Sequence, residues 1–192
     1  PAAAKTGMLY SAEIIRVVAK FFAHGQRPPL VVDPVMVATS GALLLKPTAV
    51  KALLGELLPL ATLATPNLDE AQILVGAKLA SVEDLRAAAR DIVGRFGCAA
   101  LVKGGHLRGL ATAVDIFNDG KTELLLEATF VRGVSTHGTG CTYSAAITAG
   151  LARGLPLIEA VARAKRFIAR AIESSPGLGH GCGPVNHHAP VN

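Results

Sequence analysis

Short apolar segments alternate with longer amphipathic segments along most of this chain. Residues 29–34 (PLVVDP) form a β-branched run that ends in Asp-Pro, and residues 60–67 (LATLATPN) form a run that ends in Pro-Asn. Residues 99–105 (AALVKGG) form a third run, which ends in a glycine pair. Continuous apolar runs of this length are typical of strands buried on both faces. We therefore predict three strands of a parallel sheet.

The segment between the second and third runs is predicted to be a helix. Ser81 and Asp84 have the spacing of a capping box at its start, and Gly97 is placed to end it. The apolar stripe between them has helical spacing and consists of Leu85, Ala88, Ala89, Ile92, Val93 and Phe96. Strand, helix and strand together form a βαβ unit, which favours a parallel sheet covered by helices.

The alternation changes at residues 112–129, where two strand-like runs flank an Asn-Asp-Gly sequence at 118–120. This pattern predicts an antiparallel hairpin. A helix is then expected up to about Arg153, and another from near Pro156, because proline suits the first turn of a helix. The predicted fold class is α/β, with a mainly parallel sheet, helices on both faces and one hairpin. With no long linker or repeat, residues 1–192 are predicted to form a single domain.

A glycine turn opens the helix that follows the hairpin. Gly138 and Gly140 flank Thr139, and Cys141 comes next. Free backbone N–H groups and the helix dipole attract anions at such a turn, and the threonine hydroxyl adds a donor. An ordinary helix-opening turn and a small buried cysteine are the alternatives. Beside an anion hole we favour a functional cysteine, because a helix N-terminus stabilises a thiolate.

Four further polar residues follow predicted strands, at the edge where open α/β sheets bind ligands. Asp33, Asn67 and Glu70 offer oxygen ligands for hydrated magnesium, and Lys103 offers an ammonium group for phosphate charge. Each alone has a simpler explanation, as a turn aspartate, a helix cap with a first-turn acid, or a surface lysine. Together with the anion hole they predict a phosphoryl-transfer site without a P-loop, since no GxxxxGK[ST] sequence occurs.

The net charge of +5 is spread along the chain. Its densest part is a predicted helix whose polar face we expect to be solvated, with Arg163, Lys165, Arg166 and Arg170. Two tyrosines and no tryptophan leave little for base stacking, so we expect no nucleic-acid partner. No apolar run reaches the ~18 residues of a membrane span, so no membrane association is expected. A mild positive charge suits an anionic small-molecule substrate.

The three cysteines are Cys98, Cys141 and Cys182. An odd number without a visible signal peptide argues against a disulfide framework. We therefore expect a cytoplasmic protein with free thiols.

Six sequence blocks carry a resemblance to a known family. They are KTGMLYSAEII, VVDPVMVATSGALLL, TPNLDEAQIL, LVKGGH, STHGTGCTYSAAITAGLARG and GHGCGPVNHH. In this order they closely resemble the hydroxymethylpyrimidine/phosphomethylpyrimidine kinases of thiamine biosynthesis, members of the ribokinase-like superfamily. The resemblance covers essentially the whole chain and implies the three-layer ribokinase-like fold. It further implies ATP and Mg²⁺ as cofactors, an aminopyrimidine alcohol and its phosphate as substrates, and a homo-oligomer, with a dimer favoured.

The resemblance also implies roles for individual residues. Ribokinase relatives generally place a catalytic aspartate after the GTG, whereas the pyrimidine kinases resemble this chain in placing a cysteine there. Cys141 is therefore expected to be the base, with Lys103 as its catalytic partner. The expected anion hole is Gly138, Thr139 and Gly140; the expected nucleotide and magnesium residues are Asp33, Asn67 and Glu70; and the expected substrate contact is Met8.

The chain departs from the family at its start. Family members begin with an additional βα portion that carries a glycine-rich substrate loop and lid strands, and this chain begins at the GML segment. We expect it to be a piece of a longer protein, the alternative being impaired activity.

Three other hypotheses remain open. A pyridoxal or pyridoxine kinase of the same fold shares the GTGC cysteine, and a non-enzymatic nucleotide-binding remnant is the second alternative. The third is a zinc site from His180, Cys182, His187 and His188, which has poor spacing for a structural site.

Overall fold

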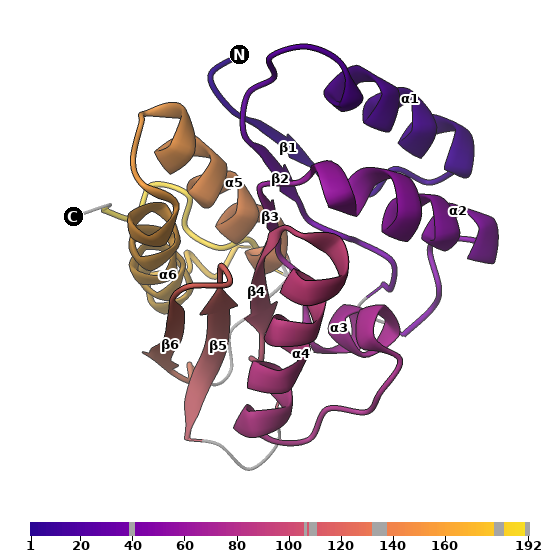
Figure 1. Cartoon of the computed structure of the whole chain (residues 1–192). Helices are drawn as coiled ribbons and strands as arrows, with labels where there is room; N and C mark the ends of the chain where they lie inside the picture. Colours follow the sequence, from indigo (N-terminus) through magenta and orange to yellow (C-terminus); the bar gives the residue numbers. More distant parts are fainter. Residues whose placement is uncertain (39–40, 106, 108–110, 132–137, 179–182, 191–192) are drawn as a thin grey trace.

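One mixed sheet of six strands runs through the molecule in the order β1-β2-β3-β4-β5-β6 (Figure 1). The computed structural model describes the whole chain except residues 39–40, 106, 108–110, 132–137, 179–182 and 191–192. The strands are β1 (Ala4–Thr6), β2 (Leu30–Val32), β3 (Leu63–Ala64), β4 (Ala99–Lys103), β5 (Thr112–Asn118) and β6 (Glu123–Thr129). Strands β1 to β4 are parallel, whereas β5 and β6 are antiparallel to their neighbours. The predicted α/β class and the predicted hairpin are both confirmed.

Helices cover both faces of the sheet, and the strand order explains which helix lies where (Figure 1). The parallel strands follow one another in a single direction, and right-handed crossovers then place all of their helices on one face. That face carries α1 (Ala12–Ala23), α2 (Pro47–Ala52), the short turns η1 (Leu53–Leu57) and η2 (Leu58–Leu60), α3 (Leu68–Val75) and α4 (Val82–Phe96). The opposite face carries α5 (Thr139–Ala152) and α6 (Leu157–Glu173).

Two apolar cores lie on the two faces of the sheet, as the alternation of side chains along each strand requires. The core against α1 to α4 contains Leu30, Val32, Ala64, Ala100, Val102 and Ile116. The core against α5 and α6 contains Val31, Leu63, Ala99, Leu101 and Phe117. The same strands therefore contribute side chains to both cores. The position of a polar residue in this alternation determines which face of the sheet its side chain points to.

Local sequence signals determine where several elements begin and end. The Ser81 side chain accepts from the Asp84 N–H, and the Asp84 carboxylate accepts from the Ser81 N–H, so the predicted capping box is present. Gly97 ends α4 in the left-handed conformation, with φ of 72°. In the hairpin turn, the Asp119 carboxylate accepts from the backbone N–H groups of Lys121 and Thr122.

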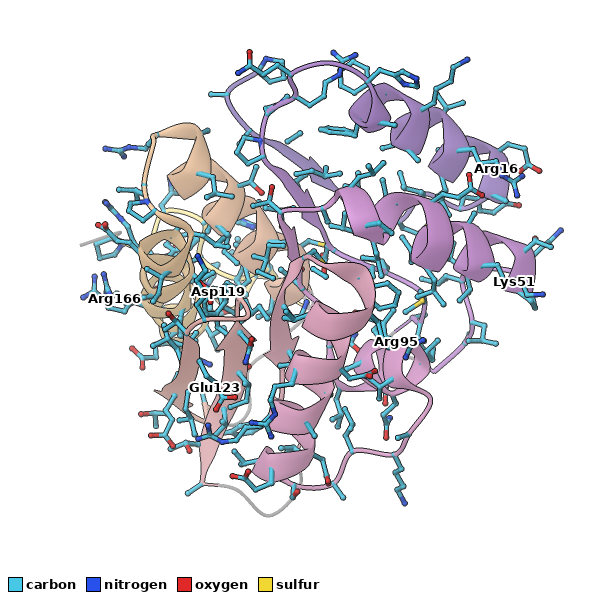
Figure 2. All side chains as sticks on the ribbon, viewed as in Figure 1. Arg16, Lys51, Arg95, Asp119, Glu123 and Arg166 are labelled. Atoms are coloured by element: carbon cyan, nitrogen blue, oxygen red, sulfur yellow. The ribbon has the colours of Figure 1, made fainter. Side chains whose placement is uncertain are left out.

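The solvated face predicted for α6 is wrong at one residue. Lys165 is buried and its Nζ donates to Oδ2 of Asp115 at 2.8 Å. Arg166 is exposed and points away from the sheet (Figure 2). Among the residues that the structure describes, no helix is both long and apolar enough to span a bilayer.

Candidate active site

The four parallel strands each place a polar side chain at or near their carboxyl end. Lys5 lies in β1 and Lys103 ends β4, while Asp33 and Thr65 directly follow β2 and β3. Lys5 pairs with Val31 in register, and Asp33, Thr65 and Lys103 each lie two residues after Val31, Leu63 and Leu101, so they share the face of those residues. Those apolar residues belong to the core beneath α5 and α6. All four polar side chains therefore point to the α5 face.

Asp33 is the centre of this cluster. Its Oδ1 accepts from Oγ1 of Thr65 at 3.0 Å and from Nζ of Lys103 at 3.2 Å. On the other oxygen, Oδ2 lies 3.2 Å from Oγ of Ser144 and 3.8 Å from Nζ of Lys5. The Asp33 side chain is only 3% exposed. Two ammonium groups around one carboxylate leave this part of the site with a positive balance, which attracts an anion.

The glycine turn at the start of α5 lies next to the Lys103 ammonium group. A Cβ atom built on Gly140 would lie 3.1 Å from Nζ of Lys103. Gly138 adopts a left-handed conformation with φ of 80°, which a residue with a side chain rarely adopts. The turn therefore needs glycine at both positions, one for backbone conformation and the other to leave room for the ammonium group.

The first turn of α5 presents hydrogen-bond donors. The first intrahelical bond runs from the N–H of Thr142 to the carbonyl of Gly138. The N–H groups of residues 139–141 precede it and have no carbonyl within the helix to bind. Oγ1 of Thr139 is also buried and has no hydrogen-bond partner among the described residues. This arrangement suits a phosphate oxygen, because an anion at a helix start satisfies such donors.

Ser144 connects the helix start to the Asp33 cluster. Its hydroxyl lies within 3.1 Å of the carbonyl oxygens of Gly140 and Cys141 and within 3.2 Å of Oδ2 of Asp33. Because this one hydroxyl reaches both, the position of the glycine turn relative to the strand ends is fixed by a buried contact. The contact of Ser144 with Asp33 depends on the tertiary fold.

The two described cysteines differ in environment. Cys141 is an exposed thiol in the first turn of α5, whereas Cys98 is a buried thiol just before β4. Burial raises the pKa of Cys98 to about 11, so it stays protonated near neutrality. Cys141 is therefore the described thiol that a substrate can reach.

Asn67 and Glu70 form a reciprocal capping box at the start of α3. The Asn67 side chain accepts from the Glu70 N–H at 2.9 Å, and Oε2 of Glu70 accepts from the Asn67 N–H at 2.8 Å. Oε1 of Glu70 lies 3.4 Å from the N–H of Met36. Burial raises the pKa of Glu70 to about 7, while the Lys103 charge lowers it and the Asp33 charge raises it further. Glu70 is thus electrostatically coupled to the Asp33 cluster.

The remaining predicted site residue, Met8, follows β1 and is 50% exposed. It lies at the carboxyl edge of the sheet, as its predicted role requires. Beside Asn67 a cavity of about 680 Å³ opens between the start of α3 and residues 78–80, with Leu107 in its wall. His180 and Cys182 of the considered zinc site lie outside the described residues.

Three residues of the cluster were not predicted from the sequence as site residues: Lys5, Thr65 and Ser144. Thr65 carries a recognisable signal, since it directly follows a short apolar strand in the same way as Asp33, whereas Lys5 is the middle residue of β1 and carries none. Ser144 follows Gly140 by one helical turn, and this spacing directs it to the same side of α5. The four strand-end groups and this serine form the Asp33 cluster, next to the glycine turn of α5.

Comparisons with known proteins identify the family of the chain. The model of a family described as phosphomethylpyrimidine kinase matches residues 1–186. The chain belongs to this family. A hydroxymethylpyrimidine/phosphomethylpyrimidine kinase of Rhizobium meliloti (strain 1021) is 50% identical over 189 residues, which are 96% of this chain and 70% of that relative. The predicted family resemblance is confirmed, and with it the prediction of a kinase.

Solved structures confirm the ribokinase-like fold. The pyridoxal kinase of Staphylococcus aureus in complex with ADP superposes with a TM-score of 0.90 at 39% identity, covering 98% of this chain and 69% of that one. A phosphomethylpyrimidine kinase from Clostridium difficile 630 superposes with a TM-score of 0.77 at 38% identity, covering 90% of this chain and 69% of that one. In these pairs the matched region spans just over two thirds of the solved chain.

Proposed function

We propose that this chain carries the phosphoryl-transfer site of an ATP-dependent kinase that acts on 4-amino-5-hydroxymethyl-2-methylpyrimidine and then on its monophosphate. The product of the two steps is the pyrophosphate used in thiamine biosynthesis. One observation carries the proposal: the Lys103 ammonium group lies between the Asp33 carboxylate and the glycine turn that opens α5. Family membership gives the reaction its substrate class.

The residues divide the work of phosphoryl transfer between them. The N–H groups of residues 139–141 and the Thr139 hydroxyl bind the oxygens of the transferred phosphoryl group as charge develops on them. Lys103 neutralises phosphate charge from the strand side. The Cys141 thiolate accepts the proton of the substrate hydroxyl, whose oxygen forms the new bond to the γ-phosphorus as ADP leaves. Met8, at the open edge, contacts the pyrimidine.

Magnesium fits the donor set on the other side of Lys103. Asp33 and Glu70 are buried carboxylates whose negative charges repel each other. A divalent cation bound near both would relieve this repulsion. We propose that Asp33, Glu70 and the Asn67 carbonyl hold Mg²⁺ through intervening water, because the Glu70 oxygens already accept backbone N–H groups. When bound, the ion neutralises nucleotide phosphate charge.

ATP is the proposed phosphoryl donor. The Staphylococcus aureus pyridoxal kinase, 39% identical to this chain, has been solved in complex with AMP-PCP. In our proposal the nucleotide lies between the β5–β6 hairpin side of the sheet and the start of α5, so that its γ-phosphate reaches the glycine turn.

We also propose that the enzyme is cytoplasmic and works as a homodimer. Sedimentation of the purified protein tests the dimer.

A pyridoxal kinase is the second candidate, and one observation favours it. The pyridoxal kinase of Staphylococcus aureus is 39% identical to this chain, and a pyrimidine kinase of the same species (strain Mu50) is 40% identical. Overall identity therefore does not separate the two substrates. A coupled assay of ADP release with hydroxymethylpyrimidine and with pyridoxal, side by side, separates them. The pyrimidine should have the higher kcat/KM; a higher value for pyridoxal would replace the first proposal with the second.

A further inference from the structure

A buried ion pair lies behind the proposed site, between α6 and the hairpin. Nζ of Lys165 donates to Oδ2 of Asp115 at 2.8 Å and to the carbonyl oxygen of Ala113 at 3.0 Å. The two charged side chains are 8% and 6% exposed. Taking two charges out of water is costly, and an apolar pair of similar volume is often as stable. The ion pair is therefore not expected to make the fold more stable than a hydrophobic pair of similar volume would.

The other oxygen of Asp115 connects this pair to the site. Oδ1 accepts from the N–H of Gly104 at 3.1 Å, beside the Val114 carbonyl oxygen, which accepts from the same N–H at 2.9 Å, and Gly104 directly follows Lys103. Asp115 is also the cross-strand partner of Lys103 in the β4–β5 ladder. Cross-strand partners share a face of the sheet, so both side chains point toward α5 and α6. Asp115 therefore holds the backbone from which the Lys103 side chain extends.

The space beside the Cα atom of Gly104 is filled by neighbouring atoms. A Cβ atom built there would lie 2.4 Å from Cδ1 of Leu85 and 2.5 Å from the carbonyl oxygen of Val114. Gly104 is thus enclosed by Leu85 of α4 on one side and by β5 on the other, and its N–H donates to the Asp115 carboxylate. A displacement of Asp115 is transmitted directly to the end of β4.

We propose that Asp115 and Lys165 are positioning residues for phosphoryl transfer: α6 holds Asp115, Asp115 holds the Gly104 N–H, and Lys103 is thereby kept between Asp33 and Gly140. This inference rests on the proposed function, because it assigns the pair a role through the phosphate-binding lysine. Neither residue touches substrate. A shift of about 1 Å in a catalytic group can reduce turnover ~100-fold, which is the size of effect that such a pair controls.

Two double variants of the full-length protein separate positioning from stability. Asp115→Leu with Lys165→Met removes the charges and the side-chain acceptor for the Gly104 N–H, and leaves only the Val114 carbonyl. Asp115→Asn with Lys165→Met removes the same charges but keeps an amide oxygen for the Gly104 N–H. Both should melt close to the wild type, since apolar or neutral replacements of a buried pair are tolerated. The leucine variant should lose kcat about 10- to 100-fold with an unchanged KM for the pyrimidine, whereas the asparagine variant should stay within about threefold of the wild type.

A second comparison keeps the test valid if the leucine variant fails to fold. Asp115→Ala with Lys165→Met adds no bulk and also lacks the side-chain acceptor for the Gly104 N–H, so it should lower kcat in the wild-type background but not further in a Lys103→Met background. Losses that act through the same residue do not add. A folded leucine variant with wild-type kcat, or additive losses with Lys103→Met, overturns the positioning role. Calorimetric titration of the wild type with AMP-PCP tests the proposed function separately. If the wild type binds no nucleotide, the proposed function fails; if it binds nucleotide, the kinetic results bear on the positioning role alone.

Discussion

Nζ of Lys103 lies 3.2 Å from Oδ1 of Asp33, although 70 residues separate the two along the chain. The topology brings them together: both stand at carboxyl ends of parallel strands in one sheet, and alternation points both to the α5 face. The contact keeps the long lysine side chain extended toward Gly140, in the glycine turn that opens α5. A carboxylate that holds an ammonium group in place before nucleotide arrives reduces the entropy lost on binding.

Replacing Lys103 with methionine tests the charge of this ammonium group. Lys103→Met keeps most of the side-chain volume, so we expect a folded protein whose kcat falls about 100- to 1,000-fold, as when one preorganised donor is lost from other active sites. Steady-state kinetics of ADP release measures this. Lys51→Met is the matched control, because Lys51 is exposed on α2, away from the site (Figure 2). Equal rates for the two variants would remove Lys103 from the mechanism.

Gly140→Ala tests the distance between the turn and the ammonium group. The added Cβ would lie 3.1 Å from Nζ of Lys103, the flexible end of a side chain. The lysine should therefore move while the fold stays intact, with a loss of kcat of at least about 10-fold and a change in unfolding free energy of less than about 1 kcal/mol. Urea unfolding and turnover measured on the same preparation show both. Full activity would mean that the turn and Lys103 do not share a phosphate.

Gly104→Ala, in contrast to Gly140→Ala, should mainly lower the unfolding free energy. Its Cβ would approach a backbone carbonyl, that of Val114, at 2.5 Å, which cannot move without distorting β5. We expect a loss of about 1–3 kcal/mol in unfolding free energy, as for overpacked sites. Gly94→Ala is the matched control: the position is exposed within α4 with nothing within 4 Å of the new Cβ, so alanine should stabilise the helix by about 0.5–1 kcal/mol. Destabilisation by both substitutions to the same extent would contradict the packing described at Gly104.

The raised pKa of Glu70 makes stability depend on pH. Burial raises that pKa from 4.5 to about 7, so between these values the native state binds a proton that the unfolded state has released. The stability from this proton is fully present below pH 4.5 and is lost as the pH rises through about 7. Relative to Glu70→Gln, which does not titrate, the unfolding free energy of the wild type should therefore fall across this range. Urea unfolding of both proteins at several pH values measures the difference.

Magnesium provides the second part of this test. If Glu70 contributes to the metal site, added Mg²⁺ should favour the charged carboxylate and reduce the pH slope of the wild type, with no such change in Glu70→Gln. The same substitution should weaken the magnesium dependence of turnover. A slope that is independent of magnesium, with an unchanged magnesium titration of turnover, would limit Glu70 to its capping role at α3.

The features that could be predicted from the sequence are those determined by near neighbours or by strand order. The capping box of Ser81 and Asp84 and the hairpin turn at 118–120 depend on residues within one turn of each other. Asp33 and Lys103 could be placed at one sheet edge because parallel strands bring their carboxyl ends together. The resemblance supplied the role of Cys141, which local pattern alone left open.

Contacts between distant elements could not be predicted in the same way. Lys165 has the position of a polar-face residue in an amphipathic helix, and only the packing of α6 against β5 reveals its buried partner, Asp115. Lys5, Thr65 and Ser144 are ordinary residue types whose importance comes from their shared contact with Asp33. Periodicity predicts which face of a helix or strand a residue lies on. It does not predict which side chain of another element that residue contacts.

The role proposed for Cys141 as the base predicts that its loss affects the two phosphorylation steps differently. A hydroxymethyl group must lose its proton as the new bond forms, whereas a phosphate monoester is largely ionised at neutral pH, with a second pKa of about 6. Cys98→Ala is the matched control, because it removes a buried thiol just before β4 rather than the exposed thiol at the start of α5. Cys141→Asp should restore part of any loss, since a carboxylate can accept the same proton.

The most direct measurement is the ratio of kcat on hydroxymethylpyrimidine to kcat on its monophosphate, for the full-length wild type and for Cys141→Ala. General-base catalysis contributes roughly 100- to 10,000-fold. We therefore predict that the ratio falls by about 100-fold or more in Cys141→Ala and is unchanged in Cys98→Ala. Equal and small losses on both acceptors, with no protection of Cys141 from alkylation by bound substrate, would contradict its role as the base.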